Sequence, residues 1–207
     1  MSAETLVFKA NCQLPTRVAV FQLFVFEEVN TNKEHIALVL GEIDTEEFTL
    51  LRIHSECMTG DTLFSLRCDC GAQLEKSMRL IADKGAGVLL YMRQEGRGIG
   101  LINKIRAYQL QDQGQDTVEA NLQLGFADDQ RNYDVCKPML HYFGINKITL
   151  LSNNLRKVIA LQNLGLEVRR TELLTKNNIY NENYLRTKAN RLGHLLQYRE
   201  AVSDTSL

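Results

Sequence analysis

Hydrophobic positions along the N-terminal part of the chain follow the pattern of strands. Residues 17–26 read RVAVFQLFVF, a dense run of β-branched and aromatic side chains. A polar stretch that contains Asn30 and Asn32 follows before apolar positions resume at residues 36–40, which predicts a hairpin. The whole region from about residue 8 to residue 48 favours strands, and residues 49–54 predict one more.

Further along, helical and strand periods alternate. Spacing of apolar residues predicts helices at residues 73–84, 101–113, 132–143 and 153–164, and buried strands at residues 88–92, 147–151 and 166–170. We expect a kink at Pro138, a loop at residues 120–129, a terminal helix at residues 184–198 and a flexible tail after about residue 199. The alternation indicates the α/β class. The expected fold is a layered α/β/α domain with a mixed sheet and a strand-rich N-terminal part, with residues 1–207 as a single domain.

Composition narrows the classes of partner. Lys and Arg total 24 against 25 Asp and Glu, and the net charge of −1 argues against broad binding of nucleic acid. No apolar run is long enough to cross a bilayer, and the N-terminus lacks the pattern of a secretory signal. We therefore expect a cytoplasmic protein without a membrane partner. In that reducing compartment, five cysteines with no regular framework point to metal binding or catalysis instead of disulfides.

Three of these cysteines, Cys57, Cys68 and Cys70, lie in one short stretch. Three thiolates suit zinc, although the spacing is not that of a zinc finger or ribbon. A closed structural site would need a fourth ligand such as His54. An open site would hold water there, and zinc would lower the pKa of that water towards about 7. The missing fourth cysteine favours the open site, and His54 is then either a ligand or a substrate contact.

A second candidate site is the loop RQEGRGIG at residues 93–100. Its glycines would let backbone amides approach an anion at the start of the following helix, and Arg93 and Arg97 could pair with phosphate. Glu95 could hold a ring edge or a magnesium ion. The alternative is a simple turn, because the loop matches neither a Walker A motif nor a Rossmann fingerprint.

Two further positions have both a chemical and a structural interpretation. Asp129 and Arg131 could place a proton acceptor and a guanidinium against one substrate, but an acidic cap on the helix expected from residue 132 explains them more simply. Tyr108 shares an apolar stripe with Leu101 and Ile105, which favours a packing role.

Longer motifs favour the chemical interpretation of these residues over the structural one. The runs SECMTGDTLFSLRCDCG, RQEGRGIGL, NKIRAYQLQDQGQDTVEAN and LGFADDQR together resemble GTP cyclohydrolase II, from about residue 52 to residue 157. The resemblance implies hydrolysis of GTP to 2,5-diamino-6-(5-phospho-ribosylamino)pyrimidin-4(3H)-one, formate and pyrophosphate, the first committed step of riboflavin synthesis. It also implies magnesium with the GTP phosphates. It further implies one zinc per subunit, held by three cysteines and water, and this zinc activates the water that opens the imidazole ring at C8.

The resemblance also assigns roles to individual residues. Cys57, Cys68 and Cys70 fall on the zinc ligands, Asp129 on the proposed proton acceptor, Arg131 on the proposed nucleophile and Tyr108 on a tyrosine of the hydrolytic steps. Positions that fall on GTP contacts are Arg52, Ile53, His54, Ser55, Glu56, Gln73, Glu95, Gly96, Arg97, Thr117, Ser152 and Lys157.

One motif departs from the family pattern. Residues 152–157 read SNNLRK where the family usually has TNNPKK, so Ser152 keeps the hydroxyl but Leu155 lacks the fixed φ of proline at the start of a helix. The family implies a homodimer, and the chain length leads us to expect the monofunctional form. The rival interpretations are a zinc-clipped nucleic-acid module and a homologue that stops after partial hydrolysis of GTP.

Overall fold

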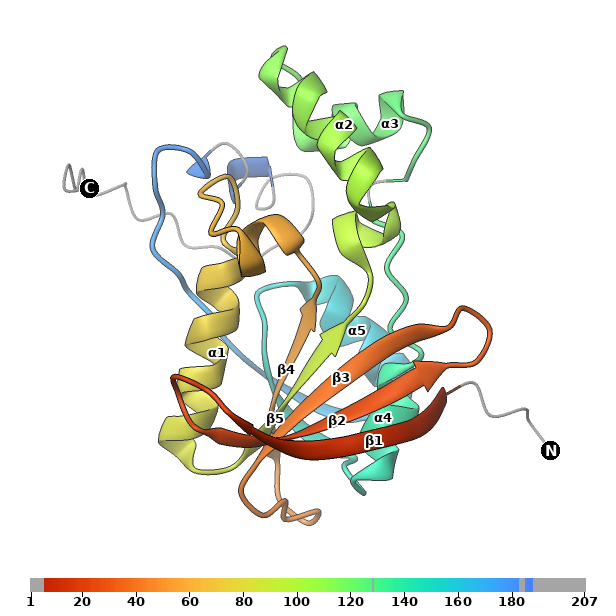
Figure 1. Cartoon of the computed structure of the whole chain (residues 1–207), viewed down its shortest axis with the longest axis vertical. Coiled ribbons are helices and arrows are strands. Elements are labelled where there is room, and N and C mark those ends of the chain that lie inside the picture. The colour runs from red at the N-terminus through yellow and green to blue at the C-terminus, as the bar shows by residue number, and fades with distance from the viewer. Residues whose placement is uncertain (1–5, 128, 183–184, 188–207) are drawn as a thin grey trace.

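A mixed sheet of seven strands forms the centre of the computed structural model, which describes residues 6–127, 129–182 and 185–187 (Figure 1). The strand order is β1-β2-β3-β5-β4-β6-β7. The first four in this order pair antiparallel, and β5, β4, β6 and β7 pair parallel. The strands are β1 (Leu6–Pro15), β2 (Val20–Glu28), β3 (Lys33–Leu40), β4 (Thr49–Ser55), β5 (Gly87–Met92), β6 (Lys147–Leu151) and β7 (Glu167–Thr171).

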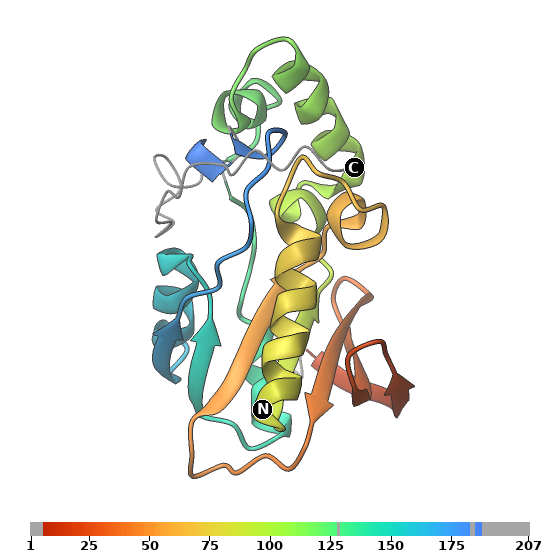
Figure 2. The ribbon, with the colours of Figure 1, turned by 90° about the vertical axis from the view of Figure 1, so that its left-hand side faces the viewer.

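Helices cover both faces of this sheet (Figures 1 and 2). Ile81 of α1 packs with Leu89 and other residues of one face, while Met139 of α4 and Leu161 of α5 pack against the other. The expected α/β class and the layered mixed sheet are therefore confirmed. The helices are α1 (Cys70–Lys84), α2 (Gly100–Asp112), α3 (Thr117–Gln123), α4 (Cys136–Tyr142) and α5 (Leu155–Asn163), with a short π-helix η1 (Met58–Thr62) and a 3₁₀ turn η2 (Glu95–Gly98).

Burial explains the strand patterns. Every residue of β4 except Ser55 is buried, and β5 is buried except at Tyr91, so both read as continuous apolar or mixed runs without alternation. The expected hairpin is also present, with β2 paired to β3 and Asn32 at a positive φ of 53° in the turn. The two buried parallel strands end side by side, with Ser55 in register with Met92.

Three expectations about helices need correction. Residues 120–129 are not simply a loop, because α3 begins at Thr117 after a capping box between Asp116 and Glu119. Helix α4 begins at Cys136 and not at residue 132, since the Asn132 side chain instead accepts the Asp134 N–H in a local turn. Pro138 consequently lies in the first turn of α4, where proline is tolerated, and not at a central kink.

The third correction concerns the face that α2 buries. We expected Leu101, Ile105 and Tyr108 to form the packed stripe, but Ile105 is 41% exposed and the buried residues are Lys104 and Ala107. The reason is the position of α2, which extends with α3 beyond the ends of the central strands instead of lying on the sheet (Figure 1). The expected terminal helix at residues 184–198 lies outside the described residues, apart from residues 185–187. Among the described helices, none has the length and apolar character needed to cross a bilayer.

Candidate active site

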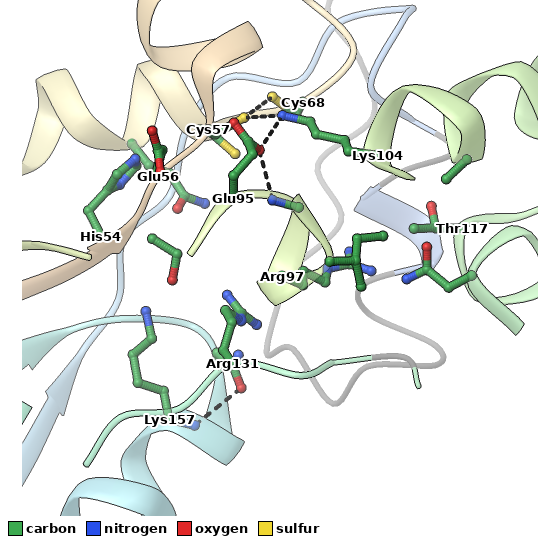
Figure 3. Close-up of a pocket in the computed structure, with 18 of the residues that line it drawn as sticks. His54, Glu56, Cys57, Cys68, Glu95, Arg97, Lys104, Thr117, Arg131 and Lys157 are labelled. Atoms are coloured by element: carbon green, nitrogen blue, oxygen red, sulfur yellow. Dashed lines mark hydrogen bonds and ion pairs between the residues drawn. The ribbon is translucent and has the colours of Figure 1, made fainter. Parts of the chain in front are cut away.

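A pocket opens where the parallel strands β4, β5 and β6 end, which is the usual place for ligands in α/β sheets. Strand ends, the loop at η2 and helices α2, α3 and α5 all contribute to it (Figure 3). Most residues predicted as site residues line it: Arg52, His54, Ser55, Glu56, Cys57, Cys68, Cys70, Gln73, Glu95, Gly96, Arg97, Tyr108, Thr117, Arg131, Ser152 and Lys157. Ile53 and Asp129 do not.

Three thiols converge on one wall of this pocket. The Sγ atoms of Cys57, Cys68 and Cys70 all lie within 4.8 Å of one another, and no other metal-binding cluster of His, Cys, Asp or Glu occurs among the described residues. The Cys57 and Cys68 sulfurs are 3.7 Å apart. Tetrahedral zinc with Zn–S bonds of about 2.3 Å needs sulfurs about 3.8 Å apart. The geometry of the three thiols therefore fits zinc.

Glycine allows the thiols to come this close. A Cβ on Gly60, in η1, would lie 2.8 Å from the Cys68 sulfur and 3.3 Å from the Cys57 sulfur. A Cβ on Gly71 would lie only 2.2 Å from the Gly60 carbonyl oxygen. Helix α1 begins at Cys70, three residues earlier than expected, so its first turn fixes the third thiol. The stretch therefore folds as two glycine-dependent turns around the sulfurs.

The three thiols do not share protons equally. Hydrogen bonds from Cys68 and Cys70 lower the pKa of Cys57 well below its usual range. The same bond to Cys57 raises the pKa of Cys68 to about 11, and the pKa of Cys70 is also raised. Loading a metal must displace the protons of these thiols, so metal binding depends on pH.

His54 does not belong to the thiol cluster. Its Nε2 lies 3.0 Å from Oδ1 of Asp61, and the side chains of both residues are almost fully buried. Oδ2 of Asp61 also accepts hydrogen bonds of 2.9 Å from the backbone N–H of Cys57 and from the Tyr91 hydroxyl. In this arrangement His54 and Tyr91 fix Asp61, and Asp61 fixes the backbone at the first metal-binding position.

Strand β4 divides its residues between core and pocket by alternation. Ile53 is fully buried in the core, where it packs with α4 and α5. It was expected to contact GTP, but it points away from the pocket. Arg52 lines the pocket and donates to Gln73 Oε1 at 2.6 Å and to the carbonyl of Leu151 at 2.9 Å. Burial lowers the pKa of Arg52 to about 10. At the strand end, Ser55 accepts from Gln94, and next to it Glu56 accepts from Arg93.

The RQEGRGIG loop has an unusual backbone. Gly96 and Arg97 both adopt left-handed conformations, with φ of 63° and 60°, and this is costly for arginine. Backbone contact with the following region holds the loop, because the Gln130 N–H donates to the Arg97 carbonyl at 3.0 Å. A strained arginine at the pocket wall is the kind of outlier that marks a functional position.

Glu95 points into the protein as well as lining the pocket. One carboxylate oxygen accepts the Met58 N–H at 2.6 Å, and the other accepts the Gly96 N–H at 2.8 Å. The second oxygen also receives the Lys104 ammonium at 2.9 Å. Glu95 thus joins the metal-binding turn to the arginine loop.

Asp129 and Arg131 form a paired unit next to this loop. Arg131 donates to Asp129 Oδ1 through its backbone N–H at 3.1 Å and through Nε at 2.8 Å, and its Nη2 pairs with Oδ2. Burial would raise the pKa of Asp129, but the bonds from Arg131 outweigh it and hold that pKa below its usual range. The expected helix cap is wrong, since α4 begins seven residues after Asp129, at Cys136.

Tyr108 faces the pocket from α2, so packing in the core is not its role. The Arg67 guanidinium lies over its ring, 4.4 Å from the centre, in cation–π geometry. Arg67 also forms an ion pair with Asp112 at 2.9 Å, near the end of α2. Arg67, the residue before Cys68, therefore links the loop that carries this cysteine to Tyr108.

The remaining predicted contacts lie at helix starts. Thr117 is the first residue of α3, and the buried Ser152 accepts from the Asn154 N–H at 3.1 Å. Lys157 donates from Nζ to the Ile53 carbonyl at 2.7 Å, and burial lowers its pKa well below the usual value. Helix α5 begins without proline because the Asn154 side chain caps it.

Among the residues that were missed from the sequence, two contact Cys57. The sequence gives no indication of a role for Asp61 other than its position between Cys57 and Cys68. Lys104 is 8% exposed and donates to the Cys57 sulfur at 3.1 Å. Burial would lower the pKa of Lys104, but its bonds to Glu95 and Cys57 outweigh that effect and raise it. Its place four residues before Tyr108, on the same helix face, was the available signal.

Fold and site together define an α/β protein with a cluster of three thiols, suited to a metal ion, on the wall of a pocket lined by arginine and lysine. The GTP cyclohydrolase II family matches residues 8–173. The GTP cyclohydrolase-2 of Hahella chejuensis is 60% identical over 193 residues, covering 93% of each chain, and that of Azotobacter vinelandii is 58% identical with the same coverage. A riboflavin biosynthesis protein of Vibrio vulnificus is 57% identical over 91% of this chain and 52% of its own. The chain belongs to the GTP cyclohydrolase II family.

Proposed function

We propose that the protein hydrolyses GTP to 2,5-diamino-6-(5-phospho-ribosylamino)pyrimidin-4(3H)-one, formate and pyrophosphate. The observation that carries the proposal is the meeting of three thiols, within 4.8 Å of one another, with arginine and lysine side chains in one pocket. Thiols alone would fit a structural clip, and a basic pocket alone would fit any phosphate ligand. A nucleotide that is opened at its base and cleaved at its phosphates needs both.

Cys57, Cys68 and Cys70 would hold the zinc, which when bound would supply Lewis-acid activation of water for attack at C8 of guanine. Tyr108 lines the same pocket and has a hydroxyl that can position or donate a proton during ring opening and release of formate. Arg67 on the ring of Tyr108 keeps that hydroxyl oriented. His54, held by Asp61, remains a substrate contact in this proposal and not a fourth ligand.

The phosphate end requires positive charge. Arg97, Arg131 and Lys157 line the pocket from three different elements and would neutralise the triphosphate (Figure 3). Between the two nucleophiles that could displace pyrophosphate, Arg131 and water, the ion pair favours water, because an arginine bonded to a carboxylate stays protonated. The expected role of Asp129 as proton acceptor requires that water to reach its carboxylate, which pairs with Arg131 outside the pocket lining. Magnesium with the phosphates and a homodimer complete the proposal and rest on the family alone.

A cysteine variant with a matched control tests the metal role. Cys57→Ser should lose bound zinc and release of formate from GTP, since it removes one of the three thiols that would hold the metal. Cys12→Ser changes an exposed cysteine of β1 and should keep both. Zinc content by atomic absorption and formate by a coupled dehydrogenase assay are the two readouts. Formate release from Cys57→Ser at the normal rate would reject the catalytic metal centre.

A tyrosine variant separates the two halves of the reaction. Tyr108→Phe removes only the hydroxyl, so it should block formation of formate while release of pyrophosphate stays measurable. Both products are measured in the same incubation with GTP. If both products disappear together, Tyr108 serves binding or packing and the proton role is wrong.

A further inference from the structure

Lys104 occupies the junction of three parts of the candidate site. Its Nζ lies 3.1 Å from the Cys57 sulfur, 2.9 Å from Glu95 Oε1 and 5.8 Å from the centre of the Tyr108 ring. Figure 3 shows the side chain reaching from α2 to the cysteines and to Glu95. An ammonium group that is almost fully buried is costly unless it is paired and hydrogen-bonded, and here the Glu95 carboxylate pairs with it and the Cys57 sulfur accepts a hydrogen bond from it.

We propose that Lys104 is a positioning residue of the metal centre, which holds the Cys57 sulfur and tunes its strength as a donor to the metal. Three thiolates around a divalent ion leave one net negative charge, and the Lys104 ammonium, which also pairs with Glu95, places positive charge at hydrogen-bond distance from one of the sulfurs. A hydrogen bond to a ligating sulfur fixes its direction and withdraws electron density from it. This inference rests on the proposed zinc site.

The bond to Glu95 makes this position rigid. Glu95 accepts the backbone N–H of Met58, the residue directly after Cys57, at 2.6 Å. Lys104 therefore holds the cysteine twice, directly at its sulfur and through Glu95 at the adjoining backbone. Because Glu95 also receives the Gly96 N–H, the same lysine links the metal centre to the arginine loop.

Metal binding without substrate is the direct test. Lys104→Met keeps much of the length but removes charge and donors, Lys104→Arg keeps both, and Arg106→Gln removes an exposed charge from the same helix as a control. Zinc affinity is measured by competition with a chelator, and cobalt(II) replaces zinc to give a sulfur-to-metal charge-transfer band. Lys104→Met should bind zinc about 10–100-fold more weakly. Its cobalt band should move to longer wavelength, because a sulfur without the hydrogen bond is a stronger donor.

The variants lead to separate conclusions. Lys104→Arg should recover most of the affinity and the band position, and Arg106→Gln should match the unaltered protein. Unchanged affinity and an unchanged band in Lys104→Met would overturn the inference. If Lys104→Met does not fold by circular dichroism, Lys104→Gln replaces it; that variant keeps N–H donors but no charge, and it should shift both readouts in the same directions by less. Unchanged values there would equally overturn it.

The outcome is independent of the proposed reaction. If the unaltered protein binds cobalt and Lys104→Met shifts the band, but GTP yields no formate, the proposed function fails and the inference stands. If GTP yields formate but neither lysine variant alters metal binding, the inference fails alone.

Discussion

Asp61 is a buried carboxylate that holds the turn at Cys57. It receives hydrogen bonds from His54 Nε2, from the Cys57 N–H and from the Tyr91 hydroxyl, at 2.9 to 3.1 Å. Its side chain is 4% exposed, so water cannot replace the carboxylate when it is removed. Asp61→Ala should therefore leave three donors without an acceptor.

The size of the effect follows from these contacts. A buried donor left unsatisfied costs about 1–3 kcal/mol, and removal of a charged acceptor lies towards the upper part of that range. Part of this is offset because the variant no longer buries a charge. We expect a loss of about 3–4 kcal/mol in the free energy of unfolding, a large share of a typical domain's stability. Tyr91→Phe removes only one of the three bonds and should cost about 1 kcal/mol.

Urea unfolding followed by far-UV circular dichroism measures both variants. Asp83→Ala, an exposed carboxylate on α1, is the control and should stay within about 0.5 kcal/mol of the unaltered protein. The series is run with excess zinc and again with EDTA. Because the bonds from His54 and Tyr91 do not involve the metal, most of the loss should persist in EDTA.

Two results would refute this reasoning. If Asp61→Ala unfolds at the same urea concentration as Asp83→Ala, the buried hydrogen bonds do not stabilise the turn. If the whole loss vanishes in EDTA, Asp61 acts only through the metal and the network with His54 and Tyr91 carries no stability of its own.

Three further predictions follow from other parts of the molecule. Leu155→Pro should stabilise the protein by about 0.4–1 kcal/mol in the same unfolding assay, since Leu155 is the first residue of α5 and Asn154 before it has an extended ψ of 108°; destabilisation would contradict this. Cys12 should react quickly with a thiol reagent in the native protein, whereas Cys136, buried and with a pKa raised to about 12, should react only after unfolding, as mass spectrometry of labelled peptides would show. GTP binding to zinc-free protein in alkaline buffer should be accompanied by uptake of a proton, because burial lowers the pKa of Lys157 and a bound phosphate would raise that pKa again. Calorimetry in two buffers should detect this uptake, and Lys157→Met should lack it. Equal heats after correction for buffer would contradict it.

Segments whose own composition decides their environment were predictable from the sequence. Strands β4, β5 and β6, which are rich in β-branched and other apolar residues, lie where the sequence predicts strands. Helix α3 was missed although its capping box, Asp116 and Glu119, is visible in the sequence, because its apolar positions have no clean period. The exposed face of α2 could not be foreseen. The helical period predicts which residues share a face of the helix, but it does not show whether that face is covered. Because α2 extends beyond the sheet, Ile102 is 71% exposed.

The candidate site likewise has one part that was predictable from the sequence and another part that was not. Three cysteines close together in one stretch led to the prediction of a metal site, and the structure brings all three thiols together. Lys104 and Cys57 are 47 positions apart, and no local pattern joins them. The inward direction of Glu95 depends on the Met58 N–H, a backbone contact 37 positions away. Contacts of this kind are set by the way strands and loops meet, so they required the fold.

Product analysis after incubation of the zinc-loaded protein with GTP tests the central claim most directly. Mass spectrometry should find the diaminopyrimidinone ribosylamine phosphate, with one formate and one pyrophosphate for each GTP consumed. A product that still carries the formyl carbon, or GTP left intact while zinc is bound, would contradict the proposed reaction.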